Sequence, residues 1–148
     1  MSTYSQVYMH IVFSVQNREN LLHKSWRDRL NKYIIAIIQN HKHKVLAIGG
    51  MEDHMHILIG YNITQLIPTL VMNMKRDSSI WIKENNLVPC RFAWQEGYGV
   101  FSYSYSHIDR MVKYIQNQEE HHKDKSSLDE YKLFLSKFEV HYDDKYVQ

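Results

Sequence analysis

The stretch VLAIGGMEDHMHILIG, residues 45–60, carries the pattern that decides the fold. Its first part, 45–48, is a short apolar run closed by two glycines, which is typical of a buried strand, and residues 54–60 are predicted to be its hairpin partner. Side chains on a strand alternate between the two faces of a sheet. One face of the second strand is apolar and is therefore expected in the core; it comprises Met55, Ile57 and Ile59.

Outward from this hairpin, strand patterns and helix patterns alternate along the chain. Alternation with β-branched or aromatic residues predicts strands, and apolar residues at helical spacing predict helices. The predicted strands cover 8–15, 45–48, 54–60 and 100–105, and the predicted helices cover 25–40, 64–82, 106–118 and 128–138. Three of these helices are expected to begin at side chains that can cap a helix: Ser25, Thr64 and Ser106.

The order of these elements indicates an α+β fold. Strand, helix, strand, strand, helix, strand and helix follow the ferredoxin-like split βαβ plan. We expect an antiparallel sheet of four to five strands with covering helices, followed by a helix that carries Tyr114. The whole chain, 1–148, is predicted to be one domain with a core at about 8–122 and a short helix and tail at 123–148, where the polar segment HHKDKSS begins at the junction.

Composition limits the classes of function. A net charge of +2 with neutral histidine gives little support for nucleic-acid binding through bulk charge, so a local basic surface is required. The sequence has no apolar run of about eighteen residues that would span a membrane and no signal-peptide pattern in MSTYSQVYMH. Because Cys90 is the single cysteine, we expect a cytoplasmic protein. A GxxxxGK(S/T) loop is absent, so nothing suggests a nucleotide cofactor.

The tripeptide His54-Met55-His56 is a candidate half of a metal site. On a strand, this spacing sends both imidazoles to one face and Met55 to the other. Asp53 alternates with His54 and is expected to point away. Taken alone, the pattern fits equally well two partly exposed strand histidines that bind no metal.

Tyr114 and Gln118 form the second candidate half. Because they are four residues apart, they share one face of the predicted helix, on the flank of its apolar stripe, where a half-buried cleft and a substrate can meet. The alternative is an amphipathic tyrosine whose hydroxyl lies in water. Tyr103 and Tyr105 are rival nucleophiles, but they lie on a predicted strand without a glutamine at helical spacing.

With these residues in place, the chain resembles the single-tyrosine HUH transposases of small bacterial insertion sequences (TnpA) and their relatives, the REP-associated tyrosine transposases. The resemblance extends from Tyr8 to His122. It is carried by DHMHILI at 53–59, WQEGYGVFSYS at 94–104 and YIQNQEEHH at 114–122.

The resemblance implies a role for each candidate residue. His54 and His56 would be two metal ligands, Gln118 the third, and Tyr114 the nucleophile. The implied metal is Mg²⁺ or Mn²⁺, although the ligand types alone also allow Zn²⁺, Co²⁺ or Ni²⁺. Free tyrosine has a pKa of about 10, so attack at neutral pH needs positive charge or a proton acceptor nearby, and the sequence identifies no such base.

The implied activity is DNA transposition. Members of this family cleave and rejoin single-stranded DNA at hairpin-marked element ends through a 5′-phosphotyrosine intermediate. They act as homodimers that pair the tyrosine helix of one subunit with the histidines of the other. A host-retained REP-associated transposase or endonuclease is an alternative within the same chemistry. A noncatalytic ferredoxin-like nucleic-acid-binding module is an alternative of another class.

Contacts to DNA phosphates are expected from basic side chains near the first two predicted helices. The candidates are Arg18, Lys75, Arg76 and Lys83. Such contacts would make the affinity for DNA fall as salt concentration rises. For any single one of these residues, a solvated helix surface is the simpler interpretation.

Overall fold

The computed structural model describes residues 2–121, 126–140 and 147. Its elements follow the order β1 (Tyr8–Ser14), α1 (Lys24–Asn40), β2 (Lys44–Gly50), β3 (His54–Gly60), α2 (Ile67–Glu84), β4 (Gly99–Ser102), α3 (Ile108–Gln116), α4 (Gln118–His121) and α5 (Ser127–Lys137). The strands form one antiparallel sheet in the order β2-β3-β1-β4. This arrangement confirms the predicted α+β fold with a split βαβ sheet.

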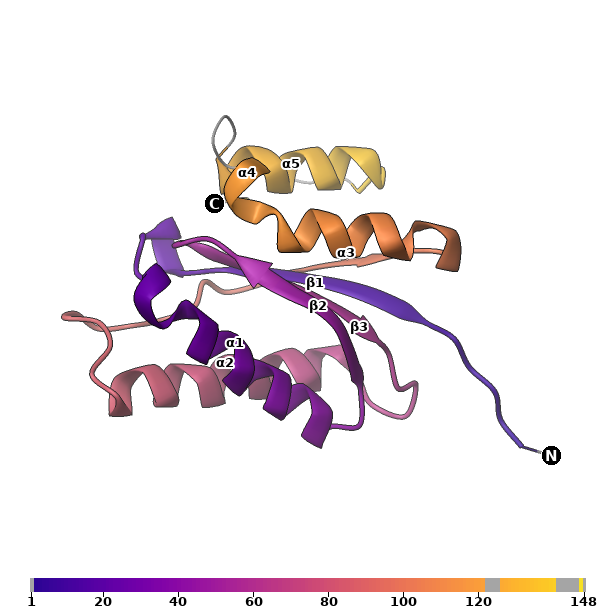
Figure 1. Ribbon diagram of the computed structural model, residues 1–148, viewed down its shortest axis with the longest axis horizontal. Coiled ribbons are helices and arrows are strands. Elements are labelled where there is room, and N and C mark those ends of the chain that lie inside the picture. The colour runs from indigo at the N-terminus through magenta and orange to yellow at the C-terminus, as the bar shows by residue number, and fades with distance from the viewer. Residues whose placement is uncertain (1, 122–125, 141–146, 148) are drawn as a thin grey trace.

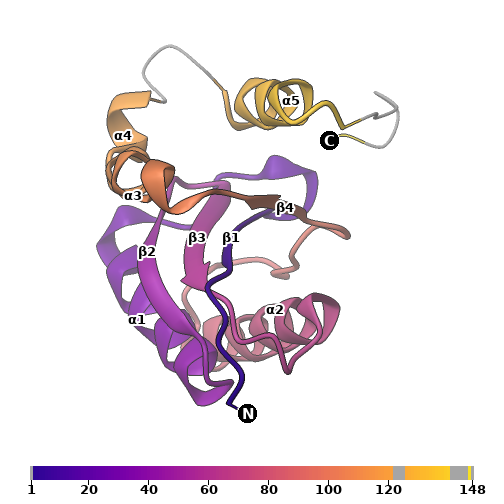
Figure 2. The same ribbon diagram turned by 90° about the vertical axis from the view of Figure 1, so that its right-hand side faces the viewer.

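Two helical layers cover the two faces of the sheet. Figure 1 shows α1 and α2 on one face and α3, α4 and α5 on the other, and Figure 2 shows α3 above β2 and β3 with α5 toward β4. The face toward α1 and α2 holds the larger core, to which the sheet contributes Ile11, Phe13, Met55, Ile57 and Ile59. The face toward α3 and α5 holds a smaller apolar cluster that includes Val12, Leu58, Phe101, Ile115 and Phe134. The predicted alternation of β3 is therefore confirmed.

The predicted helix starts are wrong by one to three residues. The structure begins α1 after His23, α2 after Leu66 and α3 after His107, and none of these three residues makes a side-chain capping bond. The expected caps are elsewhere: Thr64, for example, donates its hydroxyl to Asn62 Oδ1 over 2.7 Å in the preceding turn. A side-chain cap does occur at α5, where Ser126 Oγ accepts from the Asp129 backbone N–H over 3.2 Å.

Two elements near the candidate site are shorter than predicted. The strand expected at 100–105 ends at Ser102, whose pairing with Met9 near the start of β1 is the last pair between β1 and β4. The helix expected to carry both Tyr114 and Gln118 ends at Gln116. Asn117 leaves the helical conformation, and Gln118 opens the short α4.

The C-terminal part only partly lies within the described residues. Positions 122–125 of the HHKDKSS segment and most of the predicted tail fall outside them, whereas α5 packs on the sheet. None of the described helices combines the length and the hydropathy needed to span a membrane.

Candidate metal centre and tyrosine site

The two histidines of β3 lie side by side beneath α3 and α5. Both rings are buried, with exposed fractions of 1% for His54 and 0% for His56. Strand alternation places them on one face, and Met55 enters the core on the other. The interpretation of partly exposed strand histidines is therefore wrong, because helices cover this face of the sheet.

Both nitrogens of His54 have polar neighbours. Its Nε2 lies 3.0 Å from Gln118 Oε1, and its Nδ1 lies 2.7 Å from Asp53 Oδ1. Asp53 also accepts a hydrogen bond from Ser127 of α5 over 2.5 Å. Burial alone would raise the pKa of Asp53, but the bonds from His54 and Ser127 and the charge of Arg18 outweigh burial, so this pKa lies below its usual value. Asp53 therefore orients the His54 ring, contrary to the expectation that it points away.

Glu130 of α5 joins the histidines, although the sequence analysis missed it. Its Oε1 lies 2.7 Å from His56 Nε2 and 3.5 Å from His54 Nε2. Its other carboxylate oxygen, Oε2, accepts a hydrogen bond from the Tyr114 hydroxyl. The residue is 3% exposed. A local signal existed in α5, because Ser127, Glu130 and Phe134 recur at helical spacing and form its buried face.

The donor atoms of this group fit a divalent ion. His54, His56 and Glu130 each offer one ligand atom within 4.8 Å of the others. Two ligands at right angles on an ion with bonds of about 2.1 Å lie about 3.0 Å apart. The separations of 3.0 Å between His54 and Gln118 and of 2.7 Å between His56 and Glu130 are close to that value. The group could therefore hold a metal through two imidazoles, an amide oxygen and a carboxylate.

A buried hydrogen-bonded chain supports His56 from the far side. His10 Nε2 lies 2.8 Å from His56 Nδ1, and His10 Nδ1 lies 3.2 Å from the Tyr103 hydroxyl oxygen. Burial and the neighbouring His56 ring hold the pKa of His10 well below its usual value, so His10 is neutral. When His56 Nδ1 donates to His10, His56 Nε2 carries the lone pair that a metal would bind.

The Tyr114 hydroxyl lies among these groups within a single chain. The phenol is half-buried, and its ring meets the His56 ring edge-on at 6.0 Å between centroids. Burial raises the pKa of Tyr114, and the hydrogen bond to Glu130 and the charge of that carboxylate raise it further. The alternative of a tyrosine hydroxyl in water is wrong, because the Tyr114 hydroxyl donates a hydrogen bond to the Glu130 carboxylate. The break at Asn117 does not separate Gln118 from Tyr114, because Gln118 Nε2 donates to Tyr114 O over 3.3 Å.

Two of the four predicted DNA-binding cations are engaged by the protein. Arg18 donates to Ser14 and Ser127, each over 2.9 Å, and so fastens α5 to the end of β1. Lys75 donates to the carbonyls of Gln95 and Gly97 over 2.8 and 2.6 Å. Burial lowers the pKa of Lys75.

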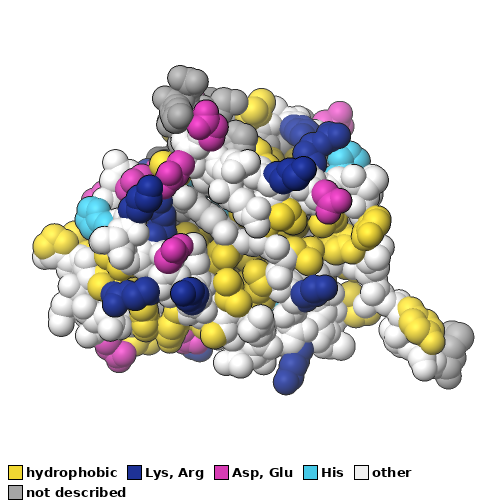
Figure 3. Space-filling model, viewed as in Figure 1, with side chains coloured by type: hydrophobic (Ala, Val, Ile, Leu, Met, Phe, Trp, Pro, Cys, Tyr) yellow, Lys and Arg dark blue, Asp and Glu magenta, His cyan; other side chains and the backbone are white. Residues whose placement is uncertain are grey.

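The other two, Arg76 and Lys83, lie at the surface of α2. They line a groove of about 430 Å³ together with Arg91 and Tyr98. Arg76 is exposed and bonds to the adjacent Asp77 over 3.0 Å. On the face shown in Figure 3, Lys and Arg side chains are dispersed among acidic ones and form no single patch. Lys75 also lines this groove, so the structure brings Lys75, Arg76 and Lys83 together, whereas Arg18 lies elsewhere.

Comparisons with known proteins place the chain in a family. A family model for IS200-like transposases matches residues 3–118, which include both histidines, the tyrosine and Gln118. The chain belongs to the IS200-like transposase family. A comparison with curated proteins gave no match. The family match ends at 118, so the helix α5 and its Glu130 lie beyond the matched region.

Solved structures show the same fold at low sequence identity. A protein from Deinococcus radiodurans R1, provisionally assigned as a transposase, aligns with a TM-score of 0.63 and 20% identity over 80% of this chain and 95% of its own. A REP-associated tyrosine transposase bound to a REP hairpin aligns with a TM-score of 0.58 and 16% identity over 78% of this chain and 70% of its own. This IS200-like transposase therefore shares its α+β fold with both.

Proposed function

We propose that this transposase cleaves and rejoins single-stranded DNA at hairpin-marked ends, with Tyr114 as the nucleophile and His54, His56 and Gln118 as metal ligands. One observation carries the proposal: the Tyr114 hydroxyl, the buried histidine pair and the Gln118 amide meet in one site. The REP-associated neighbour was solved with a hairpin, which supports a hairpin as the class of substrate.

Each residue of the site has a distinct role in the proposed reaction. Tyr114 Oη attacks the scissile phosphorus, and the phosphorus–O3′ bond breaks as the new bond forms, which leaves a 5′-phosphotyrosine and a free 3′-hydroxyl. Glu130 Oε2, which already accepts a hydrogen bond from Tyr114, is positioned to receive its proton. His54, His56 and Gln118 would hold Mg²⁺ or Mn²⁺, which would supply charge that polarises the scissile phosphate. Asp53 and His10 hold the two imidazoles in orientation.

DNA phosphates outside the centre are proposed to contact the exposed cations of α2 and its neighbouring loop. Arg76, Lys83 and Arg91 line one groove with Tyr98, whose ring offers a surface for stacking an unpaired base. Arg18 and Lys75 donate hydrogen bonds within the protein. We therefore propose that they affect DNA binding indirectly, by holding α5 and the loop at Gln95 in place.

The test is covalent capture of DNA. The chain is incubated with Mn²⁺ and a library of single-stranded hairpin oligonucleotides with randomised flanks, and adducts are resolved on a denaturing gel. Wild type should form an adduct, whereas Tyr114→Phe should form none. His56→Ala should lose the adduct and still bind the hairpin, because the ring lies in the metal centre and not on the surface.

Two further arms complete that experiment. Tyr105→Phe is the matched control and should retain the adduct, because this rival tyrosine is exposed and lies outside the centre. A combined Lys83→Ala and Arg91→Ala variant should bind the hairpin more weakly, with a salt dependence lower by about one unit of slope per lost phosphate contact. An equal adduct from Tyr114→Phe would reject the proposed nucleophile.

A further inference from the structure

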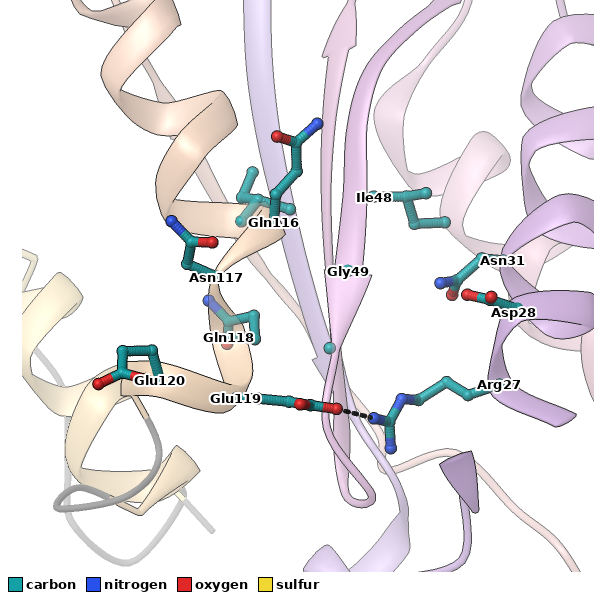
Figure 4. Close-up of a pocket in the computed structure, with 12 residues that line it drawn as sticks. Arg27, Asp28, Asn31, Ile48, Gly49, Gln116, Asn117, Gln118, Glu119 and Glu120 are labelled. Carbon is teal, nitrogen blue, oxygen red and sulfur yellow. Dashed lines mark ion pairs between the residues drawn. The ribbon is translucent and has the colours of Figure 1, made fainter. Parts of the chain in front are cut away.

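A polar cavity of about 440 Å³ lies at the outer edge of the sheet, next to the metal centre. Helix α1 supplies one wall through Asp28 and Asn31, and the junction of α3 and α4 supplies the other through 116–118. Figure 4 shows the two walls facing each other across β2, with Gly49 between them. The volume lies in the range of about 300–1,000 Å³ that small-molecule sites occupy.

The walls of this cavity are rich in amides. Asn31, Gln116, Asn117 and Gln118 all line it. A side-chain amide carries both a donor and an acceptor, which is the pairing that nucleobase edges present. Asn31 Oδ1 is shielded from solvent, and within the described part of the chain nothing donates to it. An amide that is not committed to the protein is free to turn toward a ligand.

The excess negative charge of the lining residues favours a nucleobase in the cavity over a phosphate. The lining carries three carboxylates, those of Asp28, Glu119 and Glu120, and one cation, Arg27. The Arg27 guanidinium is already engaged, because it donates to Leu22 O over 3.0 Å and lies 3.5 Å from Glu119. A phosphate would be repelled by the excess of carboxylates, whereas the amino groups of cytosine and adenine are donors that carboxylate and amide oxygens accept.

Gln118 connects this cavity to the metal centre. It lines the cavity, and its Oε1 lies 3.0 Å from His54 Nε2. A base that occupies the cavity therefore brings its own phosphodiester to the side of the histidines. We propose that the cavity binds one unpaired nucleobase next to the cleaved bond and prefers the amino-bearing bases cytosine and adenine over thymine. The proposal rests on the proposed function and names a base-reading subsite for it.

The test follows the side-chain amide signals of the ¹⁵N-labelled chain in the presence of Mg²⁺. Deoxycytidine and deoxyadenosine 5′-monophosphates should shift the signals of Asn31, Gln116 and Asn117, and thymidine 5′-monophosphate should shift them far less. Deoxyribose 5-phosphate, which lacks a base, should leave them in place. Asn31→Ala should weaken deoxycytidine monophosphate binding by roughly tenfold, as expected for a lost base contact.

The matched control is Asn40→Ala, an exposed amide on the same helix, outside the cavity. It should bind deoxycytidine monophosphate as wild type does. Equal shifts with the base-free sugar phosphate, or unchanged affinity in Asn31→Ala, would overturn the base subsite. Tyr114→Phe separates the two proposals: loss of its adduct with retained nucleotide shifts supports both, whereas retained adduct with base-specific shifts removes only the nucleophile.

Discussion

At the scale of single residues, Glu130 changes the chemistry of the site most. Its carboxylate contacts both histidines and the tyrosine, and so adds a negative charge to a centre that otherwise offers only neutral ligands. A carboxylate strengthens binding of a hard divalent ion, and it stabilises the protonated form of Tyr114 until an ion competes for it.

Glu130→Gln should therefore weaken Mn²⁺ binding by roughly ten- to a hundredfold, the range in which changes around metal ligands fall. The side chain keeps its size, so the fold should persist. Isothermal titration of the metal-free protein with Mn²⁺ measures the affinity. Asp129→Asn is the matched control, because Asp129 is exposed on the same helix and should bind Mn²⁺ as wild type does. Equal affinities for the two variants would remove Glu130 from the metal centre.

The residues that sequence reasoning found are those with a local pattern. His54 and His56 share a strand face, and Tyr114 and Gln118 are one turn apart, so periodicity alone groups each pair. Glu130 and His10 lie 74 and 46 positions from His56 along the chain, and only tertiary packing brings them to it. Pattern reasoning within a window can place Glu130 on the buried face of its helix, but it cannot detect which histidines that face contacts.

At the scale of elements, the approach of α3 to β2 depends on Gly49. A Cβ on this residue would lie 2.3 Å from the backbone oxygen of Ile115, and backbone cannot move aside as a flexible side chain does. The helix carries Tyr114 and leads into Gln118, so the absence of a side chain at one position of β2 sets how closely both approach the histidines.

Gly49→Ala should lower adduct formation by at least about tenfold and destabilise the fold by about 1–3 kcal/mol, as overpacking commonly does. Chemical denaturation measures the second effect and the capture gel the first. Gly60→Ala is the control, because its Cβ would meet Lys44 Cβ at an ordinary 3.5 Å. If Gly49→Ala matched Gly60→Ala in both measurements, the close contact would not govern the site.

Element order could be predicted, whereas element ends could not. The pattern of apolar residues identified all four strands of the sheet. The split βαβ plan followed from the order of these strands and the predicted helices. Helix starts and the end of β4 depended on partners elsewhere, as the pairing of Ser102 with Met9 illustrates. Capping residues offered a local preference that tertiary contacts overrode.

At the scale of the whole molecule, one chain contains every member of the candidate site. Gln118 and Glu130 reach the histidines of their own β3. The family resemblance implied sites shared between two subunits, and the mixing experiment below distinguishes that arrangement from a site within one chain. The arrangement in this structure needs no partner to complete the centre.

Mixing two inactive variants distinguishes the arrangements. Tyr114→Phe lacks the nucleophile and His56→Ala lacks a metal ligand, so a site built within one chain stays defective in both. We expect an equimolar mixture to form no adduct, measured on the same denaturing gel. Adduct formation by the mixture would show that the tyrosine of one subunit acts with the histidines of another. Wild type diluted to low concentration should retain its adduct per molecule.

The buried line from His56 through His10 to Tyr103 has a consequence for how the sheet is assembled. Alternation repeats every two residues, so a slip of β1 against β3 by two positions would still bury apolar side chains on the correct faces. A slip that moves His10 from opposite Leu58 to opposite Gly60 would separate the His10 and His56 rings and leave buried ring nitrogens without partners, at about 1–3 kcal/mol for each group. The hydrogen bond between His10 and His56 therefore disfavours this shifted register, which the alternation of apolar side chains alone would allow.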